Sequence, residues 1–158
     1  MGVEIERKFL VVGDHWRQLG ERVLLRQGYL STDPARTVRV RIEDGEGVLT
    51  IKGKSVGATR GEWEYPIPLA DATQLLDHLC PAPLVEKYRT RVTVGNHVWE
   101  VDEFLGANQG LIVAEIELAS EDELFLLPDW AGNEVTGQRQ YYNSQLIQRP
   151  FSQWQDGA

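Results

Sequence analysis

Cysteine is almost absent from this chain, which has one, Cys80, among 158 residues. A single cysteine excludes an internal disulfide and any metal site built from several cysteines. Cys80 lies in the stretch CPAPL between two expected elements and is interpreted as a packing residue. Histidine is also scarce, and the three residues His15, His78 and His97 lack the spacing of metal ligands, so they are interpreted as surface or packing residues.

Long apolar runs are missing as well. No stretch reaches the roughly 20 apolar residues that cross a bilayer, and the N-terminus has no signal pattern. Positive charge is in the minority, because 16 Lys and Arg stand against 24 Asp and Glu, for a net charge of −8. This balance disfavours nucleic acid or an anionic membrane as a general partner. Together these features predict a cytoplasmic protein.

No proline-rich or serine-rich linker divides the chain, so residues 1–158 are expected to form one domain with a loose tail from about residue 150 to 158. Hydrophobic residues make up 42% and charged residues 25%, which is typical of a globular protein. The glycine-rich stretch GKSVGATRG does not match a phosphate-binding loop between strand and helix, and it is interpreted as a mobile hairpin.

Alternation of apolar and polar residues dominates the sequence and predicts strands, while helical periodicity is scarce. Short turn sequences such as EDGEG favour antiparallel neighbours. Helices are expected at 71–79, capped by Asp71, and at 140–148, with a helical turn at 14–19. The strands are expected at 3–12, 23–31, 36–43, 47–54, 60–67, 85–94, 97–104 and 111–118.

Charged residues occupy alternate positions in seven of these strands, and the opening EIERKFLVV sets the pattern. Since successive side chains of a strand point to opposite faces, each set shares one face. Most sets carry one sign, although like charges on neighbouring positions repel each other. The sets are Glu4, Glu6 and Lys8; Arg39 and Arg41; Lys52 and Lys54; Glu62 and Glu64; Lys87, Arg89 and Arg91; Glu100 and Asp102; and Glu115 and Glu117.

Two arrangements account for this charged face. A half-buried sheet with one solvated face would place the charges outside. Alternatively, the sheet closes into a barrel, which removes the edges that two or three short helices could not cover. If the charged face is then the inner one, the lumen must be wet and occupied, because buried charges need partners or ions. Periodicity alone does not say which face is inside.

The ordered set of charged motifs resembles the CYTH domain family, also called triphosphate tunnel metalloenzymes. The opening ExExK is the hallmark of that family, and the later motifs follow in the family's order over nearly the whole chain. These motifs are RxR at Arg39, KxK at Lys52, RxExE at Arg60, KxR at Lys87, ExD at Glu100, ExE at Glu115, and EVTG…YYN from Glu134 to Asn143.

The resemblance implies a mainly β (α+β) fold: a closed eight-stranded antiparallel β-barrel that forms a tunnel, with a few short helices packed outside. It implies that the charged face lines the tunnel. Basic residues there would bind a triphosphate, namely Lys8, Arg39, Arg41, Lys52, Lys54, Lys87 and Arg89. Acidic residues would hold Mg²⁺ or Mn²⁺, hard ions that prefer oxygen ligands, and these residues are Glu4, Glu6, Glu115 and Glu117.

Glu4, Glu6 and Lys52 are the expected catalytic residues, with Lys52 positioning the attacking water. The acidic residues Glu62, Glu64, Glu100 and Asp102 have two interpretations: they complete a second metal or water site, or they pair with basic residues and hold them straight. Arg91 and Arg139 are further candidates, and Arg139 stands near the tyrosine pair, where relatives often have a basic residue immediately before it. Four tryptophans are expected to pack on the outer face under the helices, namely Trp16, Trp63, Trp99 and Trp130.

The resemblance implies a metal-dependent triphosphatase, and a short chain fits inorganic tripolyphosphate best, hydrolysed to pyrophosphate and phosphate. Thiamine triphosphate and nucleoside triphosphates are alternatives. Cyclisation of ATP is not expected, since cyclase relatives carry a histidine-containing extension before ExExK and here that motif begins three residues after Met1. A module that binds polyphosphate or nucleotide without turnover is the second hypothesis. A homodimer is possible in either case.

Overall fold

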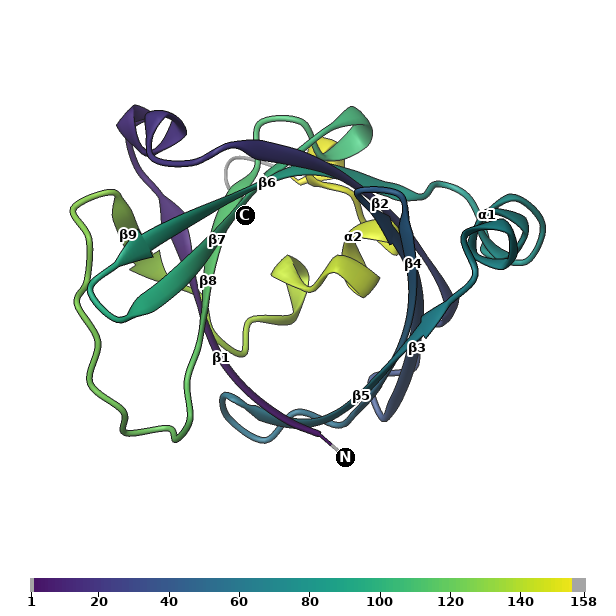
Figure 1. The fold of residues 1–158 in the computed structure, drawn as a ribbon, viewed down its shortest axis with the longest axis horizontal. Coiled ribbons are helices and arrows are strands. Elements are labelled where there is room, and N and C mark those ends of the chain that lie inside the picture. The colour runs from purple at the N-terminus through teal and green to yellow at the C-terminus, as the bar shows by residue number, and fades with distance from the viewer. Residues whose placement is uncertain (1, 155–158) are drawn as a thin grey trace.

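Eight antiparallel strands close into a barrel, which confirms the fold expected from the resemblance. The computed structural model describes residues 2–154, and Figure 1 views the barrel end-on. The strand order is β5-β4-β3-β2-β6-β7-β8-β1, and β1 pairs with β5 to close the ring. The strands are β1 (Val3–Val11), β2 (Arg22–Ser31), β3 (Arg36–Glu43), β4 (Glu46–Gly53), β5 (Thr59–Ile67), β6 (Val85–Val94), β7 (His97–Phe104) and β8 (Ile112–Glu117).

The first strand makes the closure because it is shared between two neighbours. Its first residues, Val3–Ile5, pair with Thr59–Gly61 of β5, and Glu6–Leu10 pair with β8. A ninth strand, β9 (Ala131–Glu134), then pairs with Phe9 and Val11 at the end of β1. The sequence AGNE of β9 has no alternation of apolar and polar residues, so periodicity did not predict this strand.

Tight turns hold neighbouring strands in register. Between β3 and β4, Asp44 and Gly45 connect the pair Glu43 and Glu46, with φ angles of 51° and 75°. Positive φ at both positions is characteristic of the two-residue turn that matches the twist of a hairpin. This turn fixes the register of β3 and β4, so Arg39 and Arg41 emerge on the same face as Lys52.

The longest helix, α1 (Leu69–His78), packs outside the barrel wall, where Ala72 and Leu76 bury against Val40. It begins at Leu69, directly after Pro68, so Asp71 lies in the first turn instead of capping it. The remaining helices are short. They are the 3-10 helices η1 (His15–Gln18), η2 (Gly106–Asn108), η3 (Arg139–Tyr141) and η4 (Phe151–Gln153), and the α-helix α2 (Asn143–Gln148).

A second apolar cluster covers the outer wall formed by β1, β6, β7 and β8. Trp16, Trp99 and Trp130 are buried there with Phe9, and Trp99 packs edge-on against Trp130 at 5.5 Å between ring centroids. Figure 1 shows that β9 and the segment before it cover this wall from outside. The tryptophans therefore lie mainly under a strand and a loop instead of under helices, and Trp63 is 38% exposed.

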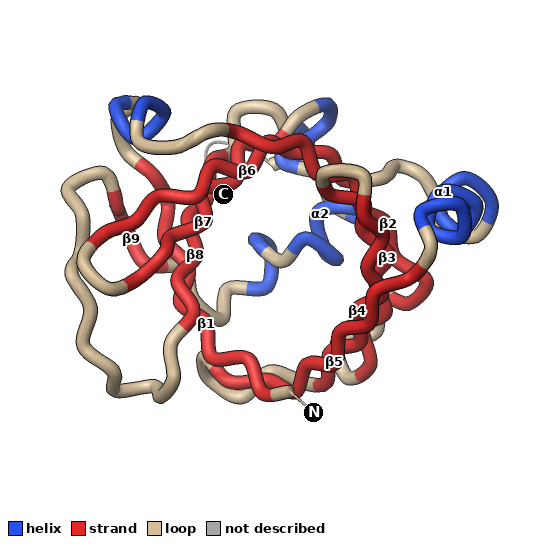
Figure 2. The backbone as a smooth tube through the Cα atoms, in the orientation of Figure 1, coloured by secondary structure: helices blue, strands red, loops and turns tan. Residues whose placement is uncertain are grey.

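One end of the barrel interior is apolar, which the charge pattern did not predict. Val85, Phe104 and Val113 share the inward face with the charged residues of their strands and pack around Leu146 of α2. Figure 2 shows α2 within the ring of strands, so this helix occupies part of one end of the barrel instead of packing outside. The burial of Leu146 among these strands fixes the C-terminal segment in place.

The segment after α2 also packs on this end, in contrast to the expected loose tail. Trp154 contacts Tyr141 and Phe151 edge-on, at 5.2 and 5.1 Å between ring centroids. The remainder of the expected tail, residues 155–158, lies outside the described residues. Among residues 2–154, no helix has the length and apolar character needed to span a bilayer.

Candidate active site

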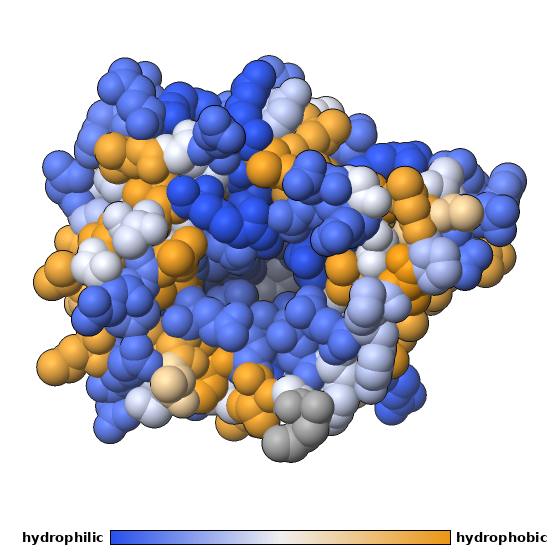
Figure 3. Space-filling view, viewed as in Figure 1, coloured by the Kyte–Doolittle hydropathy of each residue, from blue (hydrophilic) through white to orange (hydrophobic). Residues whose placement is uncertain are grey.

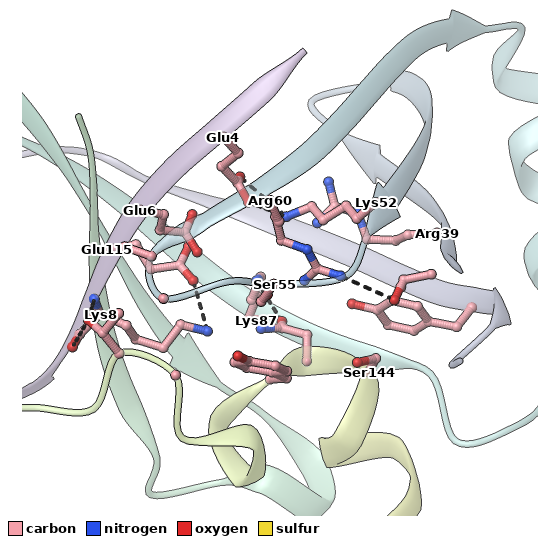
Figure 4. Close-up of a pocket in the computed structure, with 18 of the residues that line it drawn as sticks. Glu4, Glu6, Lys8, Arg39, Lys52, Ser55, Arg60, Lys87, Glu115 and Ser144 are labelled. Carbon is pink, nitrogen blue, oxygen red and sulfur yellow. Dashed lines mark hydrogen bonds and ion pairs between the residues drawn. The ribbon is translucent and has the colours of Figure 1, made fainter. Parts of the chain in front are cut away.

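The charged faces of the strands line the inside of the barrel, so the arrangement with outward charges is wrong. Figure 3 shows a hollow at the barrel axis ringed by hydrophilic residues. One cavity is lined by eight of the predicted residues from five strands, and Figure 4 shows several of them converging. They are Glu4, Glu6, Lys8, Arg39, Lys52, Lys87, Arg89 and Glu115.

Lys52 on β4 links two acidic residues across the closure of the barrel. Its ammonium donates to both carboxylate oxygens of Glu4, at 3.0 and 3.3 Å, and lies 3.5 Å from Glu62. Burial lowers the pKa of Lys52, but the charges of Glu4 and Glu6 outweigh it, and the net effect is a raised pKa. Lys52 is therefore a permanent cation that faces carboxylates inside the tunnel.

Glu62 lies beside this pair, and its surroundings favour its neutral form, whereas those of Lys52 favour the charged form. Burial, and then the neighbouring Glu4 carboxylate, raise the pKa of Glu62 to about 7. The pKa of Glu4 is lowered, because Lys52 and a hydrogen bond with Glu62 outweigh the effect of burial. The two carboxylates thus share one proton near neutral pH, as closely spaced acids do.

Lys8 occupies the other side of the cavity. Its ammonium lies 3.2 Å from Glu115 on β8 and donates at 3.4 Å to the backbone carbonyl of Tyr141. Burial raises the pKa of Glu115, but Lys8 and the neighbouring cations Lys87 and Arg89 outweigh it and hold that pKa far below its usual value. Glu115 is therefore ionised and offers a carboxylate to the tunnel.

Asp102 on β7 anchors two cations of β6. Arg89 donates to both of its oxygens, at 2.8 and 2.9 Å, and Lys87 lies 2.8 Å away. Because all three side chains are buried, the pair fixes the direction of the guanidinium. Burial lowers the pKa of Lys87 to about 8 even though Asp102 opposes the shift.

Three guanidinium groups lie near one another, and only that of Arg89 has a close ion pair, because the nearest carboxylates of Arg39 and Arg41 lie at 3.6 and 3.8 Å. Burial, and then Arg39 and Arg89, lower the pKa of Arg41. In residues 2–154, the buried Nε atoms of Arg39 and Arg41 have no hydrogen-bond partner. Forked donors that crowd together in this way suit an anion with several oxygens, as phosphate groups have.

Among the carboxylates of the cavity, Glu6 lacks a cationic partner. Burial, and then the charges of Glu115 and Glu4, raise the pKa of Glu6 well above its usual value. Lys52 and Lys8 pair with Glu4 and Glu115, not with Glu6, and Figure 4 shows Glu6 next to Glu115. A buried carboxylate without a cationic partner, next to further carboxylates, fits a hard divalent ion.

No group of three or more acidic, histidine or cysteine side chains in residues 2–154 is already set to hold a metal ion. Glu4 and Glu115 turn instead toward Lys52 and Lys8. Ion binding would therefore require these carboxylates to exchange part of their contact with lysine for the ion. The residues present fit Mg²⁺ or Mn²⁺ by their oxygen-only chemistry.

Other predicted residues lie toward the two ends of the tunnel. Arg41, Arg91 and Glu117 line one end, together with Glu64 and Glu100. Lys54 and Arg139 line a separate cavity at the other end. Four acidic residues were expected either to complete a second metal or water site or to pair with basic residues, and all four form ion pairs. The pairs are Glu62 with Lys52, Glu64 with Arg39, Glu100 with Arg89 and Arg91, and Asp102 with Lys87 and Arg89.

Several polar residues of the cavity carried no sequence signal as site residues. Asn143, at the start of α2, accepts hydrogen bonds from Lys87 at 2.8 Å and from Gln27 at 3.0 Å. Tyr142 lies under the Lys8 ammonium, 5.4 Å from the ring centroid. Both belong to the late YYN motif, which was part of the resemblance but had no assigned role. The cavity also includes Tyr29, Thr37, Ser55, Arg60, Thr136 and Ser144.

These features define a class of protein: a closed antiparallel barrel whose tunnel presents clustered cations beside clustered carboxylates. Such a lumen suits a multiply charged anion accompanied by a divalent cation. The comparison with protein families agrees, since the CYTH domain model matches residues 2–150. This chain belongs to the CYTH domain family, and that membership implies a divalent metal ion as cofactor.

Two curated relatives match over nearly their full length. The chain is 47% identical over 156 residues to an inorganic triphosphatase of Acetivibrio thermocellus, covering 99% of this chain and 100% of the relative. It is 38% identical over 152 residues to an inorganic triphosphatase of Nitrosomonas europaea, covering 90% of this chain and 95% of the relative. The crystal structure of the inorganic triphosphatase NE1496 superposes with a TM-score of 0.63 at 34% identity, covering 91% of this chain and 97% of that one.

Proposed function

We propose that this protein hydrolyses inorganic tripolyphosphate to pyrophosphate and phosphate with the help of a divalent metal ion. The observation that carries the proposal is that one tunnel brings several buried cations and several carboxylates together. Arg39, Arg41 and Arg89 suit phosphate oxygens, while Glu6 and Glu115 suit Mg²⁺ or Mn²⁺. The curated relatives named inorganic triphosphatase support the same substrate.

The bound triphosphate would be held by the basic residues of the inner cavity. Lys8, Lys87 and Arg89 are buried and held by carboxylates, so they lose little conformational entropy when they bind phosphate oxygens. Arg39 and Arg41 would add forked contacts from β3. This set would place the phosphate chain against the carboxylates of β1 and β8.

Hydrolysis would transfer a terminal phosphoryl group to water. The water oxygen forms a bond to the terminal phosphorus, the bond from that phosphorus to the bridging oxygen breaks, and pyrophosphate leaves with the bridging oxygen. Glu4, Glu6, Glu115 and Glu117 would hold the divalent ion, which would supply charge neutralisation at the phosphoryl oxygens and a more acidic water. Lys52, fixed by Glu4, would position the attacking water.

Other properties follow as parts of the proposal. We infer a single domain over residues 1–158 that acts in the cytoplasm on a small triphosphate, without nucleic acid or a membrane as partner. The net charge of −8 supports that choice of partner, since nucleic acids and anionic lipids attract basic surfaces. Assembly into a homodimer would use an outer face of the barrel and leave the tunnel unchanged.

A phosphate-release panel tests the proposal. Tripolyphosphate, thiamine triphosphate and ATP are each incubated with Mg²⁺, Mn²⁺ or a chelator. We expect the fastest release from tripolyphosphate, none with the chelator, and loss of release in Glu4→Gln. Glu103→Gln, on the outer face of β7, is the matched control and should remain active. Thermal stabilisation by tripolyphosphate without product would support the binding module instead. Faster release from thiamine triphosphate or ATP would reassign the substrate.

A further inference from the structure

The two ends of the tunnel differ in charge. One end is lined by the carboxylates of Glu62, Glu64, Glu100 and Glu117 as well as by arginines. The other opens into a cavity that we call the outer cavity, whose charged residues are Lys54, Arg60 and Arg139. No acidic residue of the described chain lines the outer cavity. In a protein with a net charge of −8, this concentration of positive charge at one end needs an explanation.

The basic residues of the outer cavity also differ from four other arginines of the surface. Arg7, Arg17, Arg26 and Arg36 each pair with a carboxylate within 3.4 Å. Lys54 and Arg139 are exposed, and neither has a carboxylate within ion-pair distance in residues 2–154. Their charge is therefore not cancelled locally, and it acts on solutes near this end of the tunnel.

Arg60 connects the outer cavity to the inner one. Its Nε donates at 3.0 Å to the carbonyl of Gly53, and Nη2 lies 3.4 Å from the hydroxyl of Thr37. Neutral acceptors thus hold the guanidinium without removing its charge. Thr37, Ser55, Arg60 and Tyr142 line both cavities, so the two cavities adjoin along a shared polar wall.

The outer cavity is large enough for a small ligand. Its volume of about 330 Å³ lies within the range of roughly 300–1,000 Å³ that is usual for small-molecule sites. Ser55, Ser144 and Gln145 add neutral hydrogen-bonding groups to its lining. The chemistry of this lining, cations and hydroxyls without carboxylates, suits a polyanion.

We propose that Lys54, Arg60 and Arg139 form an outer anion subsite that captures tripolyphosphate from solvent and feeds it into the tunnel through this end. The inference rests on the proposed function, because it takes tripolyphosphate as the substrate. The proposal assigns a role to Arg139, which the sequence named only as a further candidate near the tyrosine pair. It also assigns Lys54 to the entrance, whereas the sequence predicted Lys54 among the phosphate contacts of the tunnel.

The physical effect is on the rate of association. A cleft with uncompensated charge of one sign raises the arrival rate of an opposite charge by about 10- to 1,000-fold, and the gain falls with ionic strength. The Debye length falls from about 10 Å at 0.1 M salt to about 3 Å at 1 M. Exposed entrance cations therefore act strongly at low salt and weakly at high salt, whereas buried cations of the inner cavity are screened less.

The test compares two double variants with the same change in net charge. Lys54→Gln/Arg139→Gln removes two cations that line the outer cavity alone, and Arg60, which lines both cavities, stays. Arg22→Gln/Arg26→Gln removes two cations from the outer wall of β2 and serves as the control. Steady-state hydrolysis of tripolyphosphate is measured with each protein between 0.02 and 0.5 M salt. The Debye length falls from about 20 Å to about 4 Å over this range.

We expect kcat/KM of the entrance variant to fall about 10-fold at low salt, at the lower end of the steering range, and to converge with the wild type at high salt. The loss should fall on kcat/KM, with kcat much less affected, and the control should match the wild type. Equal salt dependence in the entrance variant and the wild type would overturn the inference. A fall in kcat alone would do so as well.

A binding measurement separates failure of the inference from failure of the proposed function. If the wild type releases no phosphate from tripolyphosphate with any metal, the proposed function is wrong. Calorimetric titration of tripolyphosphate into the chelator-treated proteins then decides whether the entrance recognises this anion. Weaker binding by Lys54→Gln/Arg139→Gln, with unchanged binding by the control, supports the subsite, whereas equal binding by all three proteins contradicts it.

Discussion

The carboxylate of Glu4 accepts two hydrogen bonds from the Lys52 ammonium, at 3.0 and 3.3 Å, and so ties β1 to β4 across the intervening strand β5. The contact joins a predicted metal ligand to the residue predicted to position water. It also explains why the two residues depend on each other: each is buried in the tunnel wall, and each supplies the charge that keeps the other ionised.

Replacement of Lys52 tests this dependence. We expect Lys52→Met to lower kcat for tripolyphosphate by about 100- to 1,000-fold, the usual effect of removing one charged donor at a reacting group. Without the ammonium, the pKa of Glu4 should rise, so the residual activity should need a higher pH. Arg17→Met, outside the barrel, is the control. Lys52→Met with wild-type kcat at every pH would rule out this role of Lys52.

Proton release should accompany metal binding, because burial and then the charges of Glu115 and Glu4 raise the pKa of Glu6 well above its usual value in the metal-free protein and so favour its protonated form. A metal ion binds the deprotonated carboxylate and displaces the proton. Titration with Mg²⁺ in two buffers of different ionisation enthalpy should therefore give different apparent heats. Glu6→Gln should reduce both the metal affinity and this difference, and identical heats for the wild type in both buffers would refute the assignment.

Lys87 should set a basic limit on substrate binding. Burial lowers its pKa to about 8, so its positive charge is present below about pH 8 and is lost above it. We expect KM for tripolyphosphate to rise above that pH in the wild type. Lys87→Arg remains charged over the whole range and should remove this part of the profile. If KM of Lys87→Arg still rises above about pH 8, the rise comes from titration of the substrate or of another residue.

Removal of Asp102 should destabilise the fold. Asp102→Asn leaves Arg89 and Lys87 buried without their carboxylate, and breaking a buried ion pair from one side costs about 3 to 5 kcal/mol. Urea unfolding at pH 7 measures the loss. Glu103→Gln, which breaks the exposed pair with Arg17 on the outer face of the same strand, should cost less than about 1 kcal/mol. Equal losses in the two variants would contradict a special role of Asp102.

The contribution of Asp102 to the stability of the fold should depend on pH. Burial raises the pKa of Asp102, but Arg89 and Lys87 outweigh it, and the folded value is lowered. The stabilisation is therefore present above the unfolded pKa of about 3.9 and is lost as the pH falls below it. The difference in stability between the wild type and Asp102→Asn should shrink between pH 5 and pH 3.

Local sequence patterns determined the eight strands of the barrel with boundaries within one or two residues, because alternation over six to ten residues is a strong local signal. The same signal failed for β9, which has only four residues and no alternation. It also gave no warning of the apolar barrel end, where Val85, Phe104 and Val113 continue the inward face of charged strands. Their role depends on α2, a segment distant in the sequence.

The sequence by itself determined which residues share a face, since the period of a strand is a property of the local backbone. Only the tertiary structure decided which face is inside, because closure of β1 onto β5 is a contact between segments more than 50 residues apart. The same closure brought Lys52 to Glu4, and the placement of α2 brought Asn143 to Lys87. Pairing across the lumen depends on the curvature of the whole sheet, which no single strand encodes.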